Sequence, residues 1–286
     1  MKVAVVGYAS LDYVVRLDSA PRLDRTSTIL SRAIEWPRLG GSPTYVAAAL
    51  MGGGVRDTML ISWVGDDRES ERYRAILANI GVDARGVGVR PGQTPVCILV
   101  YEPDGGCHCF YDPGLRHEPE LDEYQRALIT AADALCVTIG PAGATRQALA
   151  LVRADAPVAW VVKADPRAVP RDLAPAIAAR ADIVIFSEGE AAFVEEAFEG
   201  DRGALHRPIL VETRGRKEVA LSQKGEIDVI PVDPVETDDP TGAGDTFAGG
   251  FLAAWLASAD LAAAARSGAV AARGMLAERV RSSRLD

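Results

Sequence analysis

The residues best suited to chemistry lie in one stretch near the C-terminus, Asp238 to Phe247, which reads DDPTGAGDTF. A proline sets a turn there, two glycines leave the backbone open, and Asp245 stands where an apolar run begins. That run carries Phe247, Phe251 and Trp255 at helical spacing, which predicts a mostly buried helix. Because the first N–H groups of a helix are unpaired and its dipole is positive there, the stretch predicts an anion site.

An ordinary helix start, with Asp245 or Thr246 as the cap, is the alternative interpretation of the same stretch. Two glycines beside an acid at an anion site favour phosphate chemistry over it.

Strand-like and helix-like runs alternate along almost the whole chain, and these elements must position the stretch. The predicted strands are Val3–Val6, Met59–Val64, Val96–Tyr101, Leu135–Ile139, Val158–Val162, Ile183–Phe186, Ile209–Val211 and Val219–Ser222. The predicted helices are Thr44–Met51, Glu69–Asn79, Leu121–Ala132, Thr145–Arg153, Leu173–Arg180, Glu190–Phe198 and, at the alanine-rich end, Asp260–Arg281. The alternation predicts a largely parallel sheet covered by helices, with ligands beyond the carboxyl ends of the strands.

Two segments break this alternation, at about residues 13–37 and 95–112. The second holds a hairpin signal, a Pro-Asp-Gly-Gly turn between two alternating runs. We expect both segments to form a small antiparallel sheet that projects from a single domain, residues 1–286, as a lid over a site.

Composition limits the partners of the protein. With 31 basic and 40 acidic residues the net charge is −9. The basic residues are scattered and form no run, so nothing indicates a nucleic-acid partner. No stretch reaches the ~20 apolar residues of a membrane span. The four cysteines show no disulfide framework, which predicts reduced thiols in a cytoplasm. Alternation puts Cys107 and Cys109 on one face of the hairpin and His108 on the other, which favours a non-metal role.

Three more places carry polar residues or glycines beside predicted elements. Asp12 follows the first strand, where an acid can accept hydrogen bonds from ligand hydroxyls; a surface loop acid is the alternative. The pair Gly40-Gly41 precedes a helix and lets a ligand approach the backbone, although loop-to-helix junctions often look alike. Ser187 and Glu190 have the spacing of a capping box, which is compatible with a carboxylate that holds Mg²⁺ through water.

Taken together, these segments resemble the ribokinase (PfkB) family of small-molecule kinases, in the expected order from Gly7 to Gly274. The stretch at Asp245 matches D-x-x-G-A-G-D, and Gly40, Gly41 and Ala47 match G-G-x-x-x-N-x-A. Fainter matches are Gly65-Asp66-Asp67 with Gly81-Val82-Asp83, Asp165 with Arg167, Ser187 with Glu190, and Thr213 with Gly215. The chain departs from the family where asparagine is usual, at Tyr45, Pro166 and Ser187.

The resemblance implies a ribokinase-like three-layer α/β/α sandwich with a small β-sheet lid, and ATP-dependent transfer of a phosphoryl group to a substrate hydroxyl. It implies that Asp245 is the general base and that the backbone N–H groups of Gly242, Ala243 and Gly244 stabilise the transferring phosphoryl. Asp12, Gly40, Gly41 and Tyr45 would bind the acceptor. Thr213, Gly215, Asp165 and Ser187 would bind ATP. Glu190 would organise Mg²⁺, and Asp239 lies in the loop that holds an activating K⁺ in several members.

The substrate stays open at this point. A sugar is the first expectation, because Asp12 and the paired glycines are retained. A nucleoside is the alternative, since Trp36, Phe110 and Tyr111 offer aromatic surfaces to a base. A non-catalytic, ligand-sensing relative is a further alternative, suggested by the missing asparagines. The resemblance also implies a homodimer through the lid.

Overall fold

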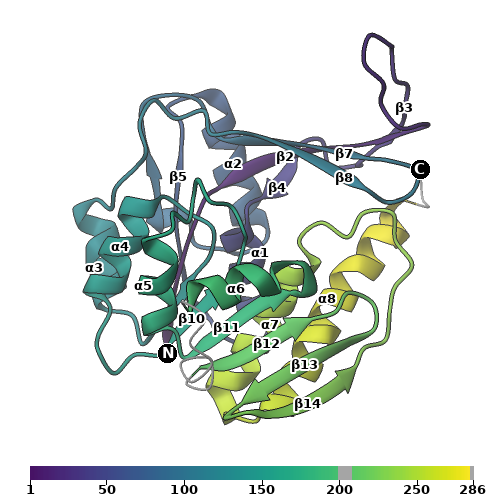
Figure 1. The fold of residues 1–286 in the computed structure, drawn as a ribbon. Coiled ribbons are helices and arrows are strands. Elements are labelled where there is room, and N and C mark those ends of the chain that lie inside the picture. The colour runs from purple at the N-terminus through teal and green to yellow at the C-terminus, as the bar shows by residue number, and fades with distance from the viewer. Residues whose placement is uncertain (199–207, 284–286) are drawn as a thin grey trace.

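A mostly parallel sheet forms the centre of the protein in the computed structural model, which describes residues 1–198 and 208–283 (Figure 1). Within these residues the strand order is β14-β13-β12-β11-β10-β9-β1-β5-β6. The strands are β1 (Lys2–Val6), β5 (Asp57–Val64), β6 (Val87–Val89), β9 (Ala134–Val137), β10 (Val158–Val161), β11 (Ile183–Ser187), β12 (Ile209–Thr213), β13 (Glu218–Gln223) and β14 (Glu226–Pro231). All neighbours from β12 to β6 pair in parallel, while β13 and β14 continue the sheet antiparallel.

Helices cover both faces of this sheet, which confirms the predicted three-layer α/β/α sandwich. Side chains alternate along β1, so that Val3 and Val5 enter one apolar core and Ala4 and Val6 the other. The first core lies under α1 (Ser42–Gly52), α2 (Arg68–Asn79), α7 (Ala243–Ser258) and α8 (Leu261–Ser283). The second lies under α3 (Glu123–Thr130), α4 (Ala142–Leu151), α5 (Leu173–Arg180) and α6 (Ala191–Ala197).

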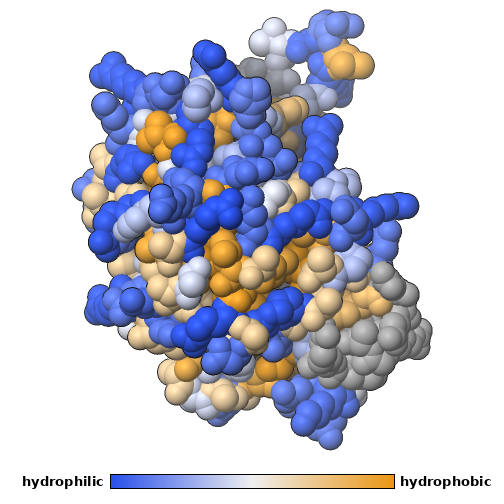
Figure 2. All heavy atoms as spheres, turned by 90° about the vertical axis from the view of Figure 1, so that its left-hand side faces the viewer, coloured by the Kyte–Doolittle hydropathy of each residue, from blue (hydrophilic) through white to orange (hydrophobic). Residues whose placement is uncertain are grey.

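The outer surface of the second helix layer is mixed in character. Figure 2 turns the left-hand side of Figure 1, where α3, α4 and α5 lie, toward the viewer, and hydrophilic residues surround smaller apolar patches there. Over the described residues, no helix is both long and apolar enough to cross a membrane.

A second, smaller sheet projects from the main body beside the carboxyl edge of the large one (Figure 1). It consists of β2 (Ser10–Leu17), β3 (Ile29–Arg32), β4 (Arg38–Gly40), β7 (Val96–Tyr101) and β8 (Cys107–Asp112). We call this sheet the lid. The predicted hairpin is confirmed as β7–β8. The expectation of a purely antiparallel lid is wrong, because β2 and β7 pair in parallel.

Other differences from the sequence prediction concern boundaries. The lid begins at Ser10 rather than near residue 13, so Asp12 lies inside a buried strand and not in a surface loop. The helix predicted from Phe247, Phe251 and Trp255 is α7, and it begins at Ala243. Its N-cap is Gly242, which lies in the left-handed region, and no side chain caps the helix. Neither Asp245 nor Thr246 is therefore the cap. Strand β14 escaped prediction because its residues are mostly exposed and carry charges between the apolar ones.

The packing of α7 on α1 yields a stability prediction at Gly249. A Cβ built there would lie 2.4 Å from the Val46 carbonyl oxygen and 2.6 Å from the Ala49 Cβ of α1. We expect Gly249→Ala to lower the free energy of unfolding by about 1–3 kcal/mol, because overpacking outweighs the gain in helix propensity. Urea denaturation measures this change.

Gly274→Ala in α8 is the matched control, since a Cβ there meets no atom within 4 Å. It should raise the free energy of unfolding by up to about 1 kcal/mol through helix propensity alone. Equal effects of the two substitutions would show that α1 and α7 are not in close contact.

Candidate active site

The carboxyl edge of the large sheet gathers most of the predicted site residues. Ser187 ends β11 and Thr213 ends β12, and the two residues pair directly across the strands. Asp165 follows β10, which lies beside β11. The parallel strands thus bring together side chains that are far apart in the sequence.

Asp245 is buried in the first turn of α7, with 7% of its surface exposed. Its Oδ1 accepts a hydrogen bond from the Ser42 hydroxyl at 2.5 Å, and the Lys163 ammonium lies 3.6 Å from the same oxygen. The charge of Asp245 raises the pKa of Lys163, which favours the protonated form of the lysine. Oδ2 accepts no hydrogen bond from the described residues, and it is not enclosed by them. One carboxylate oxygen is held and the other is free.

The N-terminus of α7 leaves donors available. The backbone N–H of Ala243 donates to the Pro240 carbonyl oxygen at 3.0 Å. It is therefore engaged, contrary to the expectation that it faces a phosphoryl group. No hydrogen bond of the described residues is donated by the N–H groups of Gly242, Gly244 or Asp245. A Cβ at Gly244 would meet nothing within 4 Å, so this side of the turn has room for an anion.

Asp12 lies on the lid side of the site and is 3% exposed. A Cβ on Gly40 would fall 1.8 Å from its Oδ1, so only glycine lets the carboxylate lie over the backbone at that position. The same oxygen accepts the Ser10 hydroxyl at 2.6 Å, while burial raises the pKa of Asp12. Since Gly40 is two residues from Ser42, the segment Gly40–Ser42 connects Asp12 to Asp245.

Tyr45 contacts the turn rather than presenting a free hydroxyl. It donates to the Leu39 carbonyl oxygen at 3.0 Å, and the Arg279 guanidinium lies 3.3 Å from the same hydroxyl. A Cβ on Gly242, whose φ is +77°, would lie 2.7 Å from the ring, so the ring rests directly on this glycine. Burial raises the pKa of Tyr45 to about 12.

Asp239 forms a two-pronged ion pair with Arg38 of β4. The Nη1–Oδ2 and Nη2–Oδ1 distances are 2.5 Å and 3.1 Å. Burial alone would raise the pKa of Asp239, but the hydrogen bonds and charge of Arg38 outweigh it and lower that pKa. Arg279 of α8 donates to the Thr241 carbonyl oxygen at 2.5 Å. Two arginines therefore hold the loop that leads into Gly242.

On the other side of the site, Glu190 and Ser187 form the capping box that their spacing predicts. Glu190 Oε2 accepts from the Ser187 backbone N–H and hydroxyl, both at 2.8 Å. Its Oε1 makes no hydrogen bond with the described residues, so it can meet an ion through water. The charge of Glu190 also helps to raise the pKa of Lys163. Asp165 accepts the Arg167 N–H at 2.8 Å. Gly215 lies in an open turn with φ +59°.

The three predicted aromatic residues do not form one surface. Cross-strand register puts Tyr111 on the inner lid face with Cys97 and Asp12, and its ring lies 5.7 Å from that of Tyr8. Phe110 alternates to the outer face and is 60% exposed. Trp36 packs edge-on against Tyr13.

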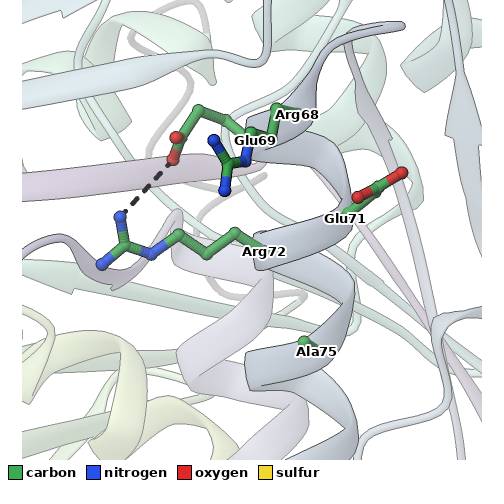
Figure 3. A pocket seen from close by; sticks show the side chains of 5 residues that line it. All are labelled: Arg68, Glu69, Glu71, Arg72 and Ala75. Carbon is green, nitrogen blue, oxygen red and sulfur yellow. Dashed lines mark ion pairs between the residues drawn. The ribbon is translucent and has the colours of Figure 1, made fainter.

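Two further features lie outside these contacts. In the described part of the chain no three His, Cys, Asp or Glu side chains gather to hold a metal ion. The ring of His108, which lies between Cys107 and Cys109 in the sequence, contacts the Glu102 carboxylate at 2.6 Å. A hollow on the surface of α2 is lined by Arg68, Glu69, Glu71, Arg72 and Ala75 (Figure 3). All five residues belong to one helix and none belongs to the predicted site.

The fold and the candidate site define a class of protein: an α/β protein with a buried carboxylate, held on one oxygen, at an open helix N-terminus beside a small second sheet. The family follows from comparison with known proteins. Residues 2–279 match the family described as pfkB family carbohydrate kinase. The chain belongs to this family and is a kinase.

Two relatives are similar over most of their length. An ATP-dependent ribose-1-phosphate kinase of Halopiger xanaduensis is 32% identical over 91% of this chain and 87% of its own. A cytidine kinase of Thermococcus kodakarensis is 28% identical over 96% of each chain.

Solved structures share the fold. A Methanocaldococcus jannaschii nucleoside kinase superposes with a TM-score of 0.79 at 20% identity, covering 95% of this chain and 90% of its own. An E. coli protein assigned as ribokinase II, solved with ATP and Mg²⁺, gives 0.77 at 21% identity, covering 95% and 91%.

Sequence reasoning missed four residues that the structure brings into the site: Ser42, Lys163, Arg38 and Arg279. A hydroxyl directly after Gly-Gly at a helix start was a usable signal for Ser42. The arginines gave none, because Arg38 and Asp239 are 201 positions apart.

The ion pair of Asp239 predicts a pH-dependent contribution to stability. Because the pKa of Asp239 is lowered in the folded protein, the pair stabilises the fold above pH ~4 and loses this effect as pH falls through the folded pKa. We expect Asp239→Asn to lower the free energy of unfolding by about 3 kcal/mol at pH 7, because Arg38 stays buried without its partner. The difference from wild type should shrink toward pH 3 in urea titrations.

Asp238→Asn is the control, since Asp238 pairs with Arg16 at the surface. Its effect should stay within about 1 kcal/mol at every pH. If Asp239→Asn lowers the free energy of unfolding equally at pH 7 and pH 3, the ion pair of Asp239 with Arg38 does not stabilise the fold as described.

Proposed function

We propose that the protein transfers the γ-phosphoryl group of ATP to a hydroxyl of a small sugar or sugar phosphate, with Asp245 as general base. The observation that carries this proposal is the state of the Asp245 carboxylate. Ser42 and Lys163 fix its Oδ1, while Oδ2 is accessible and accepts no hydrogen bond from the described residues. The Lys163 ammonium pairs with the carboxylate at 3.6 Å, and the accessible oxygen can take up a hydroxyl proton, as a base requires.

The N-terminus of α7 is suited to the phosphoryl group. The free N–H groups of Gly242, Gly244 and Asp245 point from a positive helix end, where charge on a transferring phosphoryl is stabilised. Lys163 adds a positive charge in a protein whose net charge is −9. Glu190 would hold Mg²⁺ through water by its free Oε1; when bound, this ion neutralises charge on the phosphates.

The nucleotide would lie over the ends of β10, β11 and β12. Asp165 follows β10, Ser187 ends β11, and Thr213 and Gly215 lie at the end of β12. The open turn at Gly215 leaves room for a phosphate. Ser187 acts through Glu190, because its hydroxyl is committed to that carboxylate. The solved relative with ATP and Mg²⁺ supports this pair of ligands.

Asp12 and the paired glycines would bind the acceptor. Asp12 Oδ2 accepts no hydrogen bond from the described residues and is not enclosed, so it can accept from a substrate hydroxyl. Gly41 has φ +87°, and its backbone lies at the start of α1 between Asp12 and Asp245. Tyr45 would act by supporting Gly242. The ribose-1-phosphate kinase, at 32% identity, makes a phosphorylated pentose the first acceptor to test.

A nucleoside is the second candidate acceptor, and one observation favours it. Tyr8 and Tyr111 pair with ring centroids 5.7 Å apart on the side of the lid that carries Asp12. Such a pair offers an aromatic edge to a base. The similar cytidine kinase supports the same candidate.

An acceptor panel separates these candidates. ATP consumption should be measured with ribose-1-phosphate, ribose, fructose, cytidine and inosine, each with Mg²⁺. Turnover with a sugar or sugar phosphate supports the proposal, and turnover with nucleosides alone supports the second candidate. Ligand-stabilised melting without any turnover would identify a ligand sensor instead.

The general base is tested by Asp245→Asn. We expect kcat to fall by about 10²–10⁴-fold with the best acceptor, because a neutral amide cannot take up the hydroxyl proton. Asp260→Asn is the control: Asp260 caps α8, its Oδ1 accepts the Ala263 N–H at 2.9 Å, and asparagine can keep that bond. Near-wild-type turnover of a folded Asp245→Asn variant would refute the role of the carboxylate.

The homodimer through the lid and the cytoplasmic location stay predictions from the sequence. The first is checked by the molecular mass in solution.

A further inference from the structure

We infer that Arg38 is a positioning residue that takes the place of a bound monovalent cation beside the phosphoryl-transfer turn. The resemblance to the family implies K⁺ near Asp239, but the acceptors that this loop would offer are already filled. Both oxygens of the Asp239 carboxylate bond to Arg38, and the Thr241 carbonyl oxygen accepts from Arg279. The residues present therefore do not fit a cation. This inference rests on the proposed phosphoryl transfer.

The Arg38 side chain is fixed more firmly than a surface arginine. It is 5% exposed, and both of its Nη atoms bond to the 24%-exposed carboxylate of Asp239. Its Nε is enclosed and has no partner among the described residues. Because its donors are engaged or enclosed, Arg38 acts on the loop and not on a ligand.

The loop transmits this anchoring directly to the catalytic turn. Asp239 Oδ1 also accepts the Thr241 backbone N–H at 3.2 Å, and Thr241 immediately precedes Gly242. From the lid, the Tyr101 hydroxyl meets the Thr241 hydroxyl at 2.5 Å. Movement of the Asp239 carboxylate would therefore move the first N–H groups of α7.

Arg38 also links the two halves of the site. It lies in β4, two residues before Gly40, and β4 pairs with β2 so that Arg38 stands opposite Asp12. Its charge counteracts the rise that burial produces in the pKa of Asp12. One guanidinium thus sets the separation between the acceptor-binding segment and the turn. A misplacement of about 1 Å at such a site can cost ~10²-fold in rate.

The test compares turnover in KCl, NaCl and choline chloride at equal ionic strength. Wild type should turn over equally in all three salts. Arg38→Met should lose about 10–100-fold in kcat in choline chloride with little change in KM for ATP. KCl or millimolar guanidinium chloride should restore part of that loss, and Arg38→Lys should retain more activity than Arg38→Met.

Two variants serve as controls. Arg16→Met removes the neighbouring exposed pair with Asp238 and should neither lose kcat nor respond to KCl. The double variant Arg38→Met/Asp239→Asn carries no unpaired buried charge, so it should fold, stay slow and gain nothing from KCl. Wild type that needs K⁺, or Arg38→Met with full kcat in choline chloride, would overturn the inference.

A second readout does not depend on turnover. Amide hydrogen exchange of residues 236–246 should be faster in Arg38→Met than in wild type, and KCl or guanidinium should slow it again. If no acceptor is phosphorylated by wild type, the proposed function fails while this exchange experiment still tests the anchoring. Unchanged exchange in Arg38→Met would count against the anchoring whatever the activity.

Discussion

The close contact between α1 and α7 is the constraint on which the site depends. Gly249 lets α7 approach the backbone of α1, and this approach places the starts of both helices next to one another. Ser42, the first residue of α1, then reaches Asp245 in the first turn of α7. The N-termini of two helices, each the positive end of a helix dipole, therefore lie at one carboxylate.

The lid has only a small apolar core of its own. Its own buried cluster contains only Val14, Leu99 and Tyr101 among the described residues. A cluster of this size is small for a sheet that projects from the main body. An ion pair and a hydrogen bond also join the lid to the loop at residues 238–241, through Arg38 and Tyr101. The position of the lid is therefore linked to the position of the turn at Gly242.

The sequence predicts local features of this site better than its long-range contacts. The glycine turn, the capping box at Glu190 and the β7–β8 hairpin follow from spacing over a few residues, and the structure contains all three. The pairing of Arg38 with Asp239 requires the fold to bring β4 beside a loop 201 residues away, which no local pattern encodes.

Tyr45 shows the same limit at a single position. The sequence shows a hydroxyl and a ring where the family usually has an asparagine. Only the fold reveals that Gly242 leaves the space in which this ring lies.

The two sheets carry different parts of the proposed site, which has a consequence for acceptor specificity. The groups that we propose for phosphate binding, including Lys163, Glu190 and the start of α7, lie on the large sheet and its helices, where both apolar cores fix them. The groups that we propose for the acceptor, Asp12 and Tyr111, belong to the lid. With these proposed roles, we expect changes in the lid to alter the acceptor and to leave phosphate binding in place. Arg38 lies in the lid and also pairs with Asp239, so we expect changes that move Arg38 to slow the proposed phosphoryl transfer as well.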